Sequence, residues 1–418
     1  MSNTVPEGWV VSKVGELSQV KRGASPRPIQ DPKWWGGNVG WVRISDVTSS
    51  FKYLNTTTQY LSKEGVSKSV QIPVGEVILS ICATIGRPII VGVNACIHDG
   101  FVWFDKLKAS IDREYWYYFL LSKEEFLSGQ RQSGTQGNLN TSIVAELECP
   151  LPPLPEQTKI AAILSSVDDV IEKTRAQIDK LKYLKTGMMQ ELLTKGIGHT
   201  EFKDSPVGRI PASWKVLPLE ELCTKVSVGI ASSTTHAYAS SGVPLLRNQN
   251  ILPNAIRRTD VLYISREFSD ENASKKIKEG DVLTVRTGYP GISAVVPKEF
   301  DGCHSFTTLI SRPRKSLLNC HYLSLLINSD YGKHFVVGGQ AGGAQQNLNA
   351  TTLKTFPVPL PPLAEQVAIY DAANSISAKV ALAEKKYRSL VHTKKALMQD
   401  LLTGKVRVNV DQKESAVV

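Results

Sequence analysis

The segments Leu151-Pro-Pro-Leu-Pro-Glu-Gln157 and Leu360-Pro-Pro-Leu-Ala-Glu-Gln366 divide this chain. Their paired prolines favour extended polyproline geometry and lack the N–H group that a helix interior needs, so no helix runs through either segment. The Glu-Gln pair that follows places negative charge where a helix begins, which the helix macrodipole favours. Each segment therefore predicts a stiff junction between a globular part before it and a helix after it.

The two junctions belong to a longer tandem repeat. At an offset of 205 residues, Pro6-Glu-Gly-Trp9 matches Pro211-Ala-Ser-Trp214, and residues 72–79 match 277–284. From residue 126 onward the offset is 209, which pairs 137–140 with 346–349 and 189–194 with 398–403. Collinear matches fix an architecture before any single motif does. We expect a duplication in which each copy is a globular part followed by a long helix.

Both predicted helices carry apolar residues at alternating spacings of four and three. A seam held for about 33 residues is typical of a coiled coil, whereas an amphipathic helix packed on its own domain would be shorter. We expect antiparallel pairing, because the two repeats are then related by a local two-fold axis. Gly196, Gly198 and Gly404 should end the helices. The predicted seam consists of Ile160, Leu164, Val167, Ile171, Ile178, Leu181, Met188, Leu192, Ile369, Ile376, Val380, Tyr387, Leu390, Leu397 and Leu401.

The globular parts alternate short apolar runs with turn residues, which is typical of strands. Expected strands are 41–45, 77–81, 89–91, 101–104, 243–247, 282–285 and 294–296, and helical periodicity covers 113–128 and 320–337. The predicted fold class is α+β, with two similar globular domains, two long helices that form an antiparallel coiled coil, and internal pseudo-two-fold symmetry. The expected order is a first domain at 1–154, a helix at 155–197, a second domain at 198–362, a helix at 363–404 and a tail at 405–418.

The composition indicates which class of partner the chain binds and in which cellular compartment it works. The 418 residues include 49 Lys and Arg against 39 Asp and Glu, and this net charge of +10 favours a polyanion. The N-terminus lacks the basic and apolar regions of a secretory signal, and the most apolar stretch, 77–93, is too short to cross a bilayer. Six separated cysteines without a C-x-x-C spacing favour reduced thiols. We therefore expect a cytoplasmic protein without membrane contact.

Taken together, the repeated motifs resemble those of a known family, the DNA-specificity subunits of Type I restriction–modification systems. The order of domains and helices is similar to that family over essentially all 418 residues. One departure lies in the second domain, where Arg247-Asn-Gln-Asn250 stands in place of Arg43-Ile-Ser-Asp46. The motifs that carry the resemblance are Pro6-Glu-Gly-Trp9, Trp41-Val-Arg-Ile-Ser-Asp46, the Gly-(Glu/Asp)-Val strands, Asn138-Leu-Asn140, the two Leu-Pro-Pro-Leu-x-Glu-Gln segments and the Met-Gln-(Glu/Asp)-Leu-Leu-Thr helix ends.

The resemblance implies a subunit that binds a bipartite, gapped site in double-stranded DNA, one half per globular domain. It also implies two methyltransferase subunits as partners, which carry S-adenosylmethionine, and restriction subunits that bring ATP and Mg in the full complex. No cofactor is expected in this chain itself. Because the domains should be related by a pseudo-dyad, the half-sites should be inverted. If they are centred one helical turn apart, roughly 5–8 unread base pairs should separate them.

The sequence offers no catalytic motif. The P-loop, G-x-S-x-G and H-E-x-x-H patterns are absent, and Leu-Pro-Pro-Leu stands where an amino-methyltransferase would carry Asn/Asp-Pro-Pro-aromatic. Cys96 with His98, and Cys303 with His304, could begin a metal site, but buried structural residues are the favoured interpretation. A non-catalytic subunit is therefore predicted. The alternatives are a single-chain restriction–methylation enzyme and a coiled-coil structural adaptor without DNA readout.

Base readout needs side chains that reach the groove edges, chiefly Arg on guanine and Asn or Gln on adenine, with Lys and Arg on phosphates. Asn138-Leu-Asn140 and Asn347-Leu-Asn349 are nearly the same in both copies, which favours helix capping over readout. The DNA-binding candidates are Lys21, Arg22, Arg27, Arg43, Arg131, Gln136, Arg247, Asn248, Asn250, Arg286, Gln340, Gln345 and Gln346.

Overall fold

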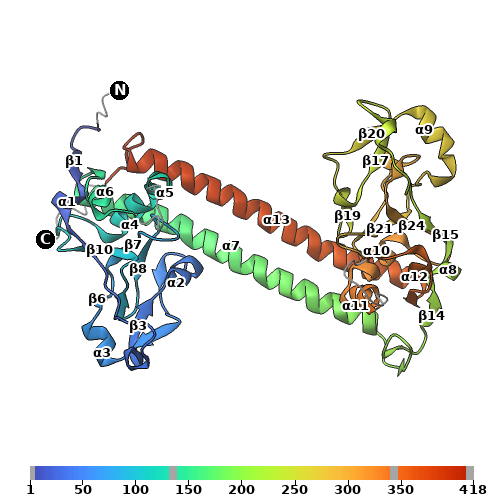
Figure 1. Ribbon diagram of the computed structural model, residues 1–418, viewed down its shortest axis with the longest axis horizontal. Helices are drawn as coiled ribbons and strands as arrows, with labels where there is room; N and C mark the ends of the chain where they lie inside the picture. The colour runs from blue at the N-terminus through green and yellow to red at the C-terminus, as the bar shows by residue number, and fades with distance from the viewer. Residues whose placement is uncertain (1–4, 131–138, 339–346, 411–418) are drawn as a thin grey trace. The chain divides into compact units, whose positions relative to one another are not determined.

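The computed structural model describes residues 5–130, 139–338 and 347–410, and the chain forms two compact units (Figure 1). Unit 1 comprises Met1–Gln177 and Ala383–Val418, and unit 2 comprises Ile178–Leu382. The boundaries fall inside the two long helices, α7 (Leu154–Lys195) and α13 (Leu363–Leu402). Each unit therefore contains one globular part and a portion of both helices. Unit 1 is made of two separate stretches of the chain, whereas consecutive domains and helices were predicted from the sequence.

The globular part of unit 1 is a mixed α and β structure. Its strands are β1 (Val10–Lys13), β2 (Gln19–Arg22), β3 (Trp35–Val42), β4 (Tyr53–Leu54), β5 (Gln59–Leu61), β6 (Val70–Ile72), β7 (Val77–Ser80), β8 (Pro88–Val91), β9 (Ala95–Ile97), β10 (Phe101–Asp105) and β11 (Glu148–Leu151). Its helices are α1 (Val14–Leu17), η1 (Pro32–Trp34), α2 (Ile44–Ser49), α3 (Lys63–Ser67), α4 (Arg113–Ser122), α5 (Glu124–Gly129) and α6 (Thr141–Ala145). Among its described residues, the strands form sheets of order β2-β10-β7-β8-β4, β5-β3-β9-β6 and β1-β11.

Unit 2 repeats this arrangement. Its strands are β12 (Phe202–Lys203), β13 (Ile210–Pro211), β14 (Lys215–Pro218), β15 (Cys223–Val228), β16 (Tyr238–Ala239), β17 (Val243–Leu246), β18 (Ile251–Leu252), β19 (Ala255–Ile256), β20 (Leu262–Ile264), β21 (Val282–Val285), β22 (Ser293–Val295), β23 (His304–Ser305), β24 (Thr308–Pro313) and β25 (Pro357–Leu360). Its helices are α8 (Leu219–Leu222), η2 (Thr235–Ala237), η3 (Asn248–Asn250), α9 (Arg266–Glu271), η4 (Ala273–Lys275), η5 (Lys298–Phe300), α10 (Cys320–Asn328), α11 (Asp330–Gly338) and α12 (Ala350–Lys354). The sheets β15-β24-β21-β22, β16-β20-β17-β23 and β14-β25 correspond to those of unit 1.

The predicted secondary structure forms with two local differences. The strand expected over 41–45 ends at Val42, because the backbone N–H of Arg43 donates to the Asp46 carboxylate and turns the chain into α2. The helices expected over 113–128 and 320–337 are each divided in two, at Lys123 and at Ser329. The apolar runs are otherwise strands as expected, and β7 and β8 are buried on both faces.

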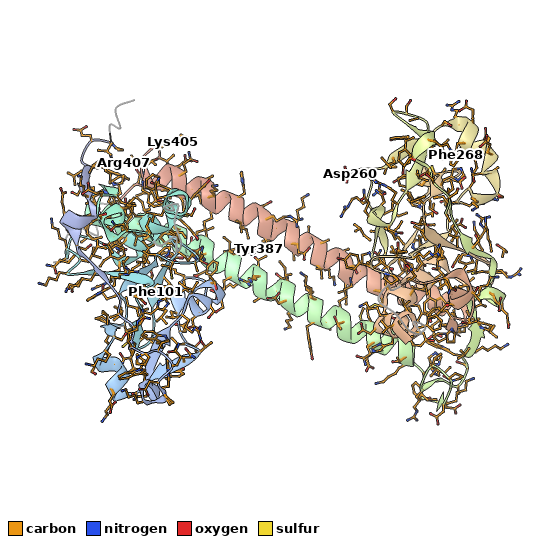
Figure 2. The ribbon with its side chains drawn as sticks, in the orientation of Figure 1. Phe101, Asp260, Phe268, Tyr387, Lys405 and Arg407 are labelled. Atoms are coloured by element: carbon orange, nitrogen blue, oxygen red, sulfur yellow. The ribbon has the colours of Figure 1, made fainter. Side chains whose placement is uncertain are left out.

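The long helices α7 and α13 pack against each other antiparallel, as predicted. In unit 1, Asp168 in the first half of α7 forms an ion pair of 2.6 Å with Lys394 near the end of α13. In unit 2, Leu193 near the end of α7 shares a core with Ile369 at the start of α13. Every residue of the predicted seam is buried or half-buried, including Tyr387 (Figure 2). The low exposure of these positions fits the spacing expected of a seam.

The end points of the helices also match the prediction. Gly196 and Gly404 follow α7 and α13 with φ angles of +64° and +73°, a backbone conformation that glycine adopts without strain. No helix in the described part of the chain has an apolar stretch long enough to cross a membrane. The six cysteines are free thiols, and four of them, Cys96, Cys149, Cys223 and Cys303, are buried.

A buried glutamine fastens each long helix to its globular part. The side chain of Gln157 accepts a hydrogen bond from Asp112 N at 2.9 Å and donates to the carbonyl oxygens of Ser110 and Pro152 at 3.1 and 2.9 Å. Gln366 makes the equivalent three bonds at 2.8–2.9 Å and is fully buried. These bonds explain why the Glu-Gln pair is repeated, beyond the favourable helix dipole expected from the sequence.

The neighbouring glutamate joins three parts of the chain. Glu156 accepts from the indole Nε1 of Trp9 at 3.1 Å, and Arg407, which follows α13, donates to both of its oxygens at 2.7 and 2.8 Å (Figure 2). Glu365 likewise accepts from Trp214 Nε1 at 3.1 Å and lies 2.8 Å from Nε2 of His199, which follows α7. We call each Glu-Gln pair with these partners a helix anchor.

We expect the substitution Gln366→Ala to lower the free energy of unfolding by on the order of 3 kcal/mol, because one buried N–H group and two buried carbonyl groups lose their partner. Urea denaturation of the full chain measures the loss. Gln190→Ala, at an exposed position of α7, is the control and should change stability by less than about 0.5 kcal/mol. Equal losses of unfolding free energy for the two substitutions would show that the bonds of Gln366 contribute no more to stability than an exposed side chain does.

Candidate nucleic-acid interface

Both units place an arginine at the same turn. In unit 1 the backbone N–H of Arg43 donates to Asp46 Oδ2 at 2.9 Å, and in unit 2 that of Arg247 donates to Asn250 Oδ1 at 2.9 Å. An aspartate oxygen and an asparagine oxygen are equivalent acceptors here, so the departure in the second repeat preserves the turn. We name these two segments the arginine turns.

Asn250 is a correction to the predicted DNA contacts. Its side chain is fully buried, its oxygen accepts from Arg247, and its amide nitrogen donates to Thr259 O at 3.1 Å. Because both ends of the amide are used inside the fold, no group is left for a base edge. Asn250 stabilises the arginine turn and leaves the set of candidate contacts.

Asp99, in the turn between β9 and β10, gathers basic side chains in unit 1. The Nε group of Arg22 donates to the Asp99 carbonyl oxygen at 2.5 Å, and Arg27 Nη2 lies 3.3 Å from its carboxylate. Ser25 Oγ donates to the same carboxylate at 2.6 Å, and this bond is the main reason that the pKa of Asp99 is lowered. Asp99 is therefore ionised near neutral pH, and its carboxylate holds Ser25 and Arg27 in the loop after β2, while its carbonyl oxygen holds Arg22 at the end of that strand.

His98 connects this cluster with the arginine turn of unit 1. Its ring lies 5.8 Å from Trp41, which immediately precedes the turn, and 4.8 Å from Phe101. Burial lowers the pKa of His98, the charge of Asp99 opposes this, and the charges of Arg43 and Arg22 lower it further. Arg43 itself is exposed, and its Nη1 donates to Gln59 Oε1 at 3.2 Å. Three predicted arginines thus lie around one turn.

Lys21 stands apart from that group. It lies on β2 and forms an ion pair with Asp105, and its ammonium is 5.9 Å from the centre of the Trp103 ring. The side chain is half exposed. Lys21 can therefore contact a phosphate only by sharing its charge with Asp105.

In unit 2 the arginine turn meets the end of β21. Arg247 Nη2 donates to the carbonyl oxygen of Asp260 at 3.0 Å (Figure 2), and Asn248 Nδ2 donates to the carbonyl and hydroxyl oxygens of Thr287 at 3.2 and 3.0 Å. Arg286 precedes Thr287 and is half-buried. Three predicted side chains, Arg247, Asn248 and Arg286, are therefore neighbours, although they come from two segments.

Three polar atoms of this group lack a hydrogen-bond partner in the described part of unit 2. They are Nε of Arg247, Oδ1 of Asn248 and Nε of Arg286, and all three are buried. Most buried polar atoms in proteins are paired, so each such atom calls for an explanation. A ligand that offers both donors and acceptors would complete these two donors and one acceptor, which belong to two adjoining segments.

Asn140 and Asn349 are structural, and so is the leucine before each of them. Asn140 caps α6 by accepting from Ser142 N at 3.1 Å, and Asn349 caps α12 by accepting from Thr352 N at 2.7 Å, which confirms the expectation of capping. The leucines between the asparagines donate backbone bonds to the residues that follow β7 and β21, at 2.8 and 3.0 Å. The remaining predicted contacts, Arg131, Gln136, Gln340, Gln345 and Gln346, lie outside the described residues.

Residue types alone did not reveal Asp99, His98 or Tyr289. Asp99 carries the charge opposite to that expected at a DNA interface, and its role is visible only from its contacts. Tyr289 lies three residues after Arg286, between Gly288 and Gly291, whose φ angles are +84° and +93°, and its side chain is 79% exposed. An aromatic residue in a glycine-bounded turn was the signal that could have identified it.

Comparison with known proteins places this geometry in a family. Residues 6–183 and 211–391 match the family described as the Type I restriction modification DNA specificity domain. The chain belongs to this family. It is 28% identical to the MjaVIII specificity subunit of Methanocaldococcus jannaschii, over 97% of this chain and 94% of that protein. It is 20% identical to the EcoKI specificity subunit of Escherichia coli, over 96% and 89% of the two chains.

Solved structures of this family share the fold. The S subunit from M. genitalium superposes with a TM-score of 0.57 at 13% identity, covering 96% of this chain and 97% of that one. A chain from a structure that describes assembly and conformational transition of the type I R-M system gives 0.61 at 18% identity, with coverage of 96% and 100%. The α+β domains and long helices are thus common to relatives with little sequence identity.

The arrangement around His98 can be tested by NMR titration of the histidine ring. Arg43→Ala should raise the pKa of His98, because a nearby positive charge that disfavours the imidazolium is removed. Asp99→Asn should lower it, because the favourable negative charge is lost. Arg258→Ala, in unit 2, is the control, and His98→Gln assigns the resonance. A His98 titration that is insensitive to both unit 1 substitutions would refute the proposed geometry.

Proposed function

We propose that this chain is the DNA-specificity subunit of a type I restriction–modification complex and that each unit reads one half of a bipartite, gapped site in double-stranded DNA. The observation that carries the proposal is the arginine turn, which both units keep although the residues around Arg43 and Arg247 differ. Membership of the specificity-domain family supports it. The net charge of +10 supports it as well, since it attracts a polyanion.

In unit 1 the cluster divides into reading and positioning groups. Arg43 is exposed, and one of its nitrogen atoms is fixed by Gln59, so its remaining N–H groups can form a fork to O6 and N7 of guanine. Arg22 and Arg27 are tied to the Asp99 turn beside it and suit phosphate oxygens. The carboxylate of Asp99 holds Arg27 and its backbone carbonyl oxygen holds Arg22 before DNA arrives, which lowers the entropy cost of binding.

In unit 2 the unpaired atoms define the reading group. A base edge in the major groove offers both acceptors and donors, and therefore can satisfy Arg247, Arg286 and Asn248 together. Tyr289 projects beside them and can contact a base or sugar face. The two units differ in these side chains, so they should read different half-sites.

We further propose that the chain is non-catalytic and docks two methyltransferase subunits, which bring S-adenosylmethionine, and restriction subunits, which bring ATP and Mg. The adjacent exposed side chains of Tyr183 and Leu184 on α7 support a protein interface there, because contiguous apolar surface marks places where partners bind. Tyr183 is 84% exposed and Leu382 is 69% exposed. The exposed apolar residues of the two helices include Val170, Tyr183, Leu184, Leu382 and Val391.

The main test is selection of preferred DNA from a library with two randomised half-sites and a variable gap. Arg43→Ala should relax one half-site and Arg247→Ala the other, each at a cost of about 1–3 kcal/mol. Lys21→Ala should weaken all sequences alike and reduce the salt slope by less than about one unit, because Asp105 already shares its charge. Arg258→Ala, which removes an exposed, paired cation, is the control. Equal losses on selected and random DNA for both arginines, or selection of an ungapped site, would contradict the proposal.

Docking has a separate test. The double substitution Tyr183→Glu with Leu184→Glu places charge on exposed apolar positions of α7 and should prevent co-purification with the methyltransferase subunit of the same system. DNA selection by the isolated chain should be unchanged. Gln177→Glu, at another exposed position of α7, is the matched control and should co-purify normally. Undiminished assembly of the double variant would show that this part of α7 is not the docking surface.

A further inference from the structure

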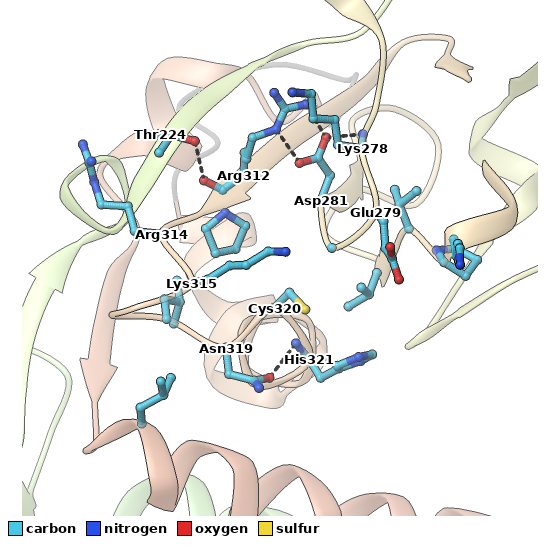
Figure 3. Close-up of a pocket in the computed structure, with 18 of the residues that line it drawn as sticks. Thr224, Lys278, Glu279, Asp281, Arg312, Arg314, Lys315, Asn319, Cys320 and His321 are labelled. Carbon is cyan, nitrogen blue, oxygen red and sulfur yellow. Dashed lines mark hydrogen bonds and ion pairs between the residues drawn. The ribbon is translucent and has the colours of Figure 1, made fainter. Parts of the chain in front are cut away.

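Unit 2 contains a large pocket at the corner where β21, β22 and β24 approach α10 and the start of α13 (Figure 3). Its volume is about 920 Å³, within the size range of small-molecule sites. One wall is the ion pair of Asp281 and Arg312, in which two guanidinium nitrogens each lie 2.7 Å from a carboxylate oxygen. Asp281 is only 1% exposed. The pocket is thus built on a fixed polar wall.

The charge around the pocket is strongly positive. The basic residues Lys278, Lys298, Arg314 and Lys315 line it, and no described residue forms an ion pair with any of them. Figure 3 shows the side chain of Lys315 extending across the middle of the pocket. Glu279 is the acidic lining residue that stands against them, since Asp281 is neutralised by Arg312. The pocket therefore attracts an anion that carries more than one negative charge.

The amino terminus of α10 is not the source of this attraction. Asn319 Oδ1 accepts from the backbone N–H groups of His321 and Tyr322 at 2.9 and 3.0 Å, so these groups are already paired. The lysine and arginine side chains must supply the binding charge.

The first repeat differs from unit 2 at the place of this pocket. Asp112 and Asn319 occupy equivalent places, because each donates its backbone N–H to the anchor glutamine. The next residue is Arg113 in unit 1 and Cys320 in unit 2. Arg113 Nη2 reaches 2.7 Å from Glu76, the counterpart of Asp281 in the repeat, so a long side chain extends from α4 to this acid in unit 1. Cys320 is too short to do so in unit 2, where Arg312 is the partner of Asp281.

Two of the basic residues have no charged counterpart in unit 1. Lys278 and Lys298 have Pro73 and Val93 as their counterparts, whereas Lys315 has Lys108 at the offset that pairs Asn319 with Asp112. A general need for solubility or for DNA affinity would not place two additional cations around one opened cavity. The changes together indicate a site that one repeat acquired.

The remaining lining and the position of the pocket indicate the kind of ligand. Val296, Pro297, Pro313 and Leu318 form an apolar side, which suits a flat ring. The pocket lies at the start of β21, whereas Arg286 follows its end, roughly 16 Å away at about 3.3 Å per residue. DNA read at the arginine turn would therefore be at the other end of the strand.

We propose that this pocket binds a free nucleoside phosphate, with its phosphate groups at Lys315 and Lys278 and its base against the apolar side. Phosphate chemistry fits several convergent ammonium and guanidinium groups, and the volume fits one nucleotide. The site is independent of DNA reading by the arginine turns.

Fluorescence anisotropy of ADP labelled on its ribose with an N-methylanthraniloyl group, titrated with the full chain, tests the proposal. Binding should saturate, and Lys315→Ala should weaken it roughly tenfold or more. Lys108→Ala removes an equal charge from the equivalent segment of unit 1 and is the matched control. Cys320→Arg adds a positive charge but places in the pocket a long side chain like that of Arg113 in unit 1, so it should also abolish binding. Equal melting temperatures of the variants exclude loss of the fold.

The outcomes separate this site from its alternatives. Tighter or unchanged binding by Cys320→Arg would mean that the nucleotide follows general charge, and it would overturn the proposal. Absence of saturable binding to the unsubstituted chain would overturn it as well. In a further outcome the nucleotide fails to bind, while Lys315→Ala weakens the binding of duplex DNA of every sequence and lowers the salt dependence of that binding. The pocket would then be a contact for DNA backbone phosphates. Normal DNA selection by Lys315→Ala would leave the proposed function intact whichever way the nucleotide test ends.

Discussion

The rest of the structure depends on the helix anchors, in which a buried glutamine and its neighbouring glutamate fix where each long helix leaves its globular part. Gln157 and Gln366 each use both ends of the amide, so the direction of the helix is set by three bonds rather than by packing alone. Glu156 and Glu365 add a tryptophan from the start of the same globular part and a basic group from beyond the end of the other helix. Each arginine turn is therefore carried on a globular part that is tied to both helices.

The features that follow from periodicity could be predicted from the sequence. The repeat and the two paired helices were predicted, because a heptad pattern depends only on the order of residues along one helix. The sequence predicted a strand that runs through Arg43 to Ser45, whereas the bond from the Arg43 backbone to Asp46 outweighs the strand preference of Ile44 and starts a helix there. A single hydrogen bond between a side chain and the backbone of this kind cannot be predicted from the residue types of the segment.

The candidate site could be predicted only in part, for a different reason. Residue type says which groups a side chain offers, but tertiary contacts decide whether those groups are free. Asn250 and Asn248 look alike in sequence, yet the first is enclosed by the turn and the second keeps an unpaired oxygen. Asp99 shows the converse, since an acidic residue holds two arginines, one through its carbonyl oxygen and one through its carboxylate. The pocket beside Cys320 became recognisable because the chain carries its own comparison, a second copy in which Arg113 stands at the place of Cys320 and reaches Glu76.

Unit 1 is formed by the two ends of the chain and unit 2 by the stretch between them, which has a consequence for synthesis on the ribosome. Unit 2 is one continuous stretch, Ile178–Leu382, whereas unit 1 needs Ala383–Val418 in addition to Met1–Gln177. At about 5–20 residues per second, the missing part of unit 1 emerges roughly 10–40 s after its first part. During that interval the seam of α7 around Asp168 lacks Lys394, and Glu156 lacks Arg407. Unit 1 is therefore started first and completed last. Until residues 383–418 are synthesised, the apolar face of α7 in unit 1 is exposed and can pair with other apolar segments.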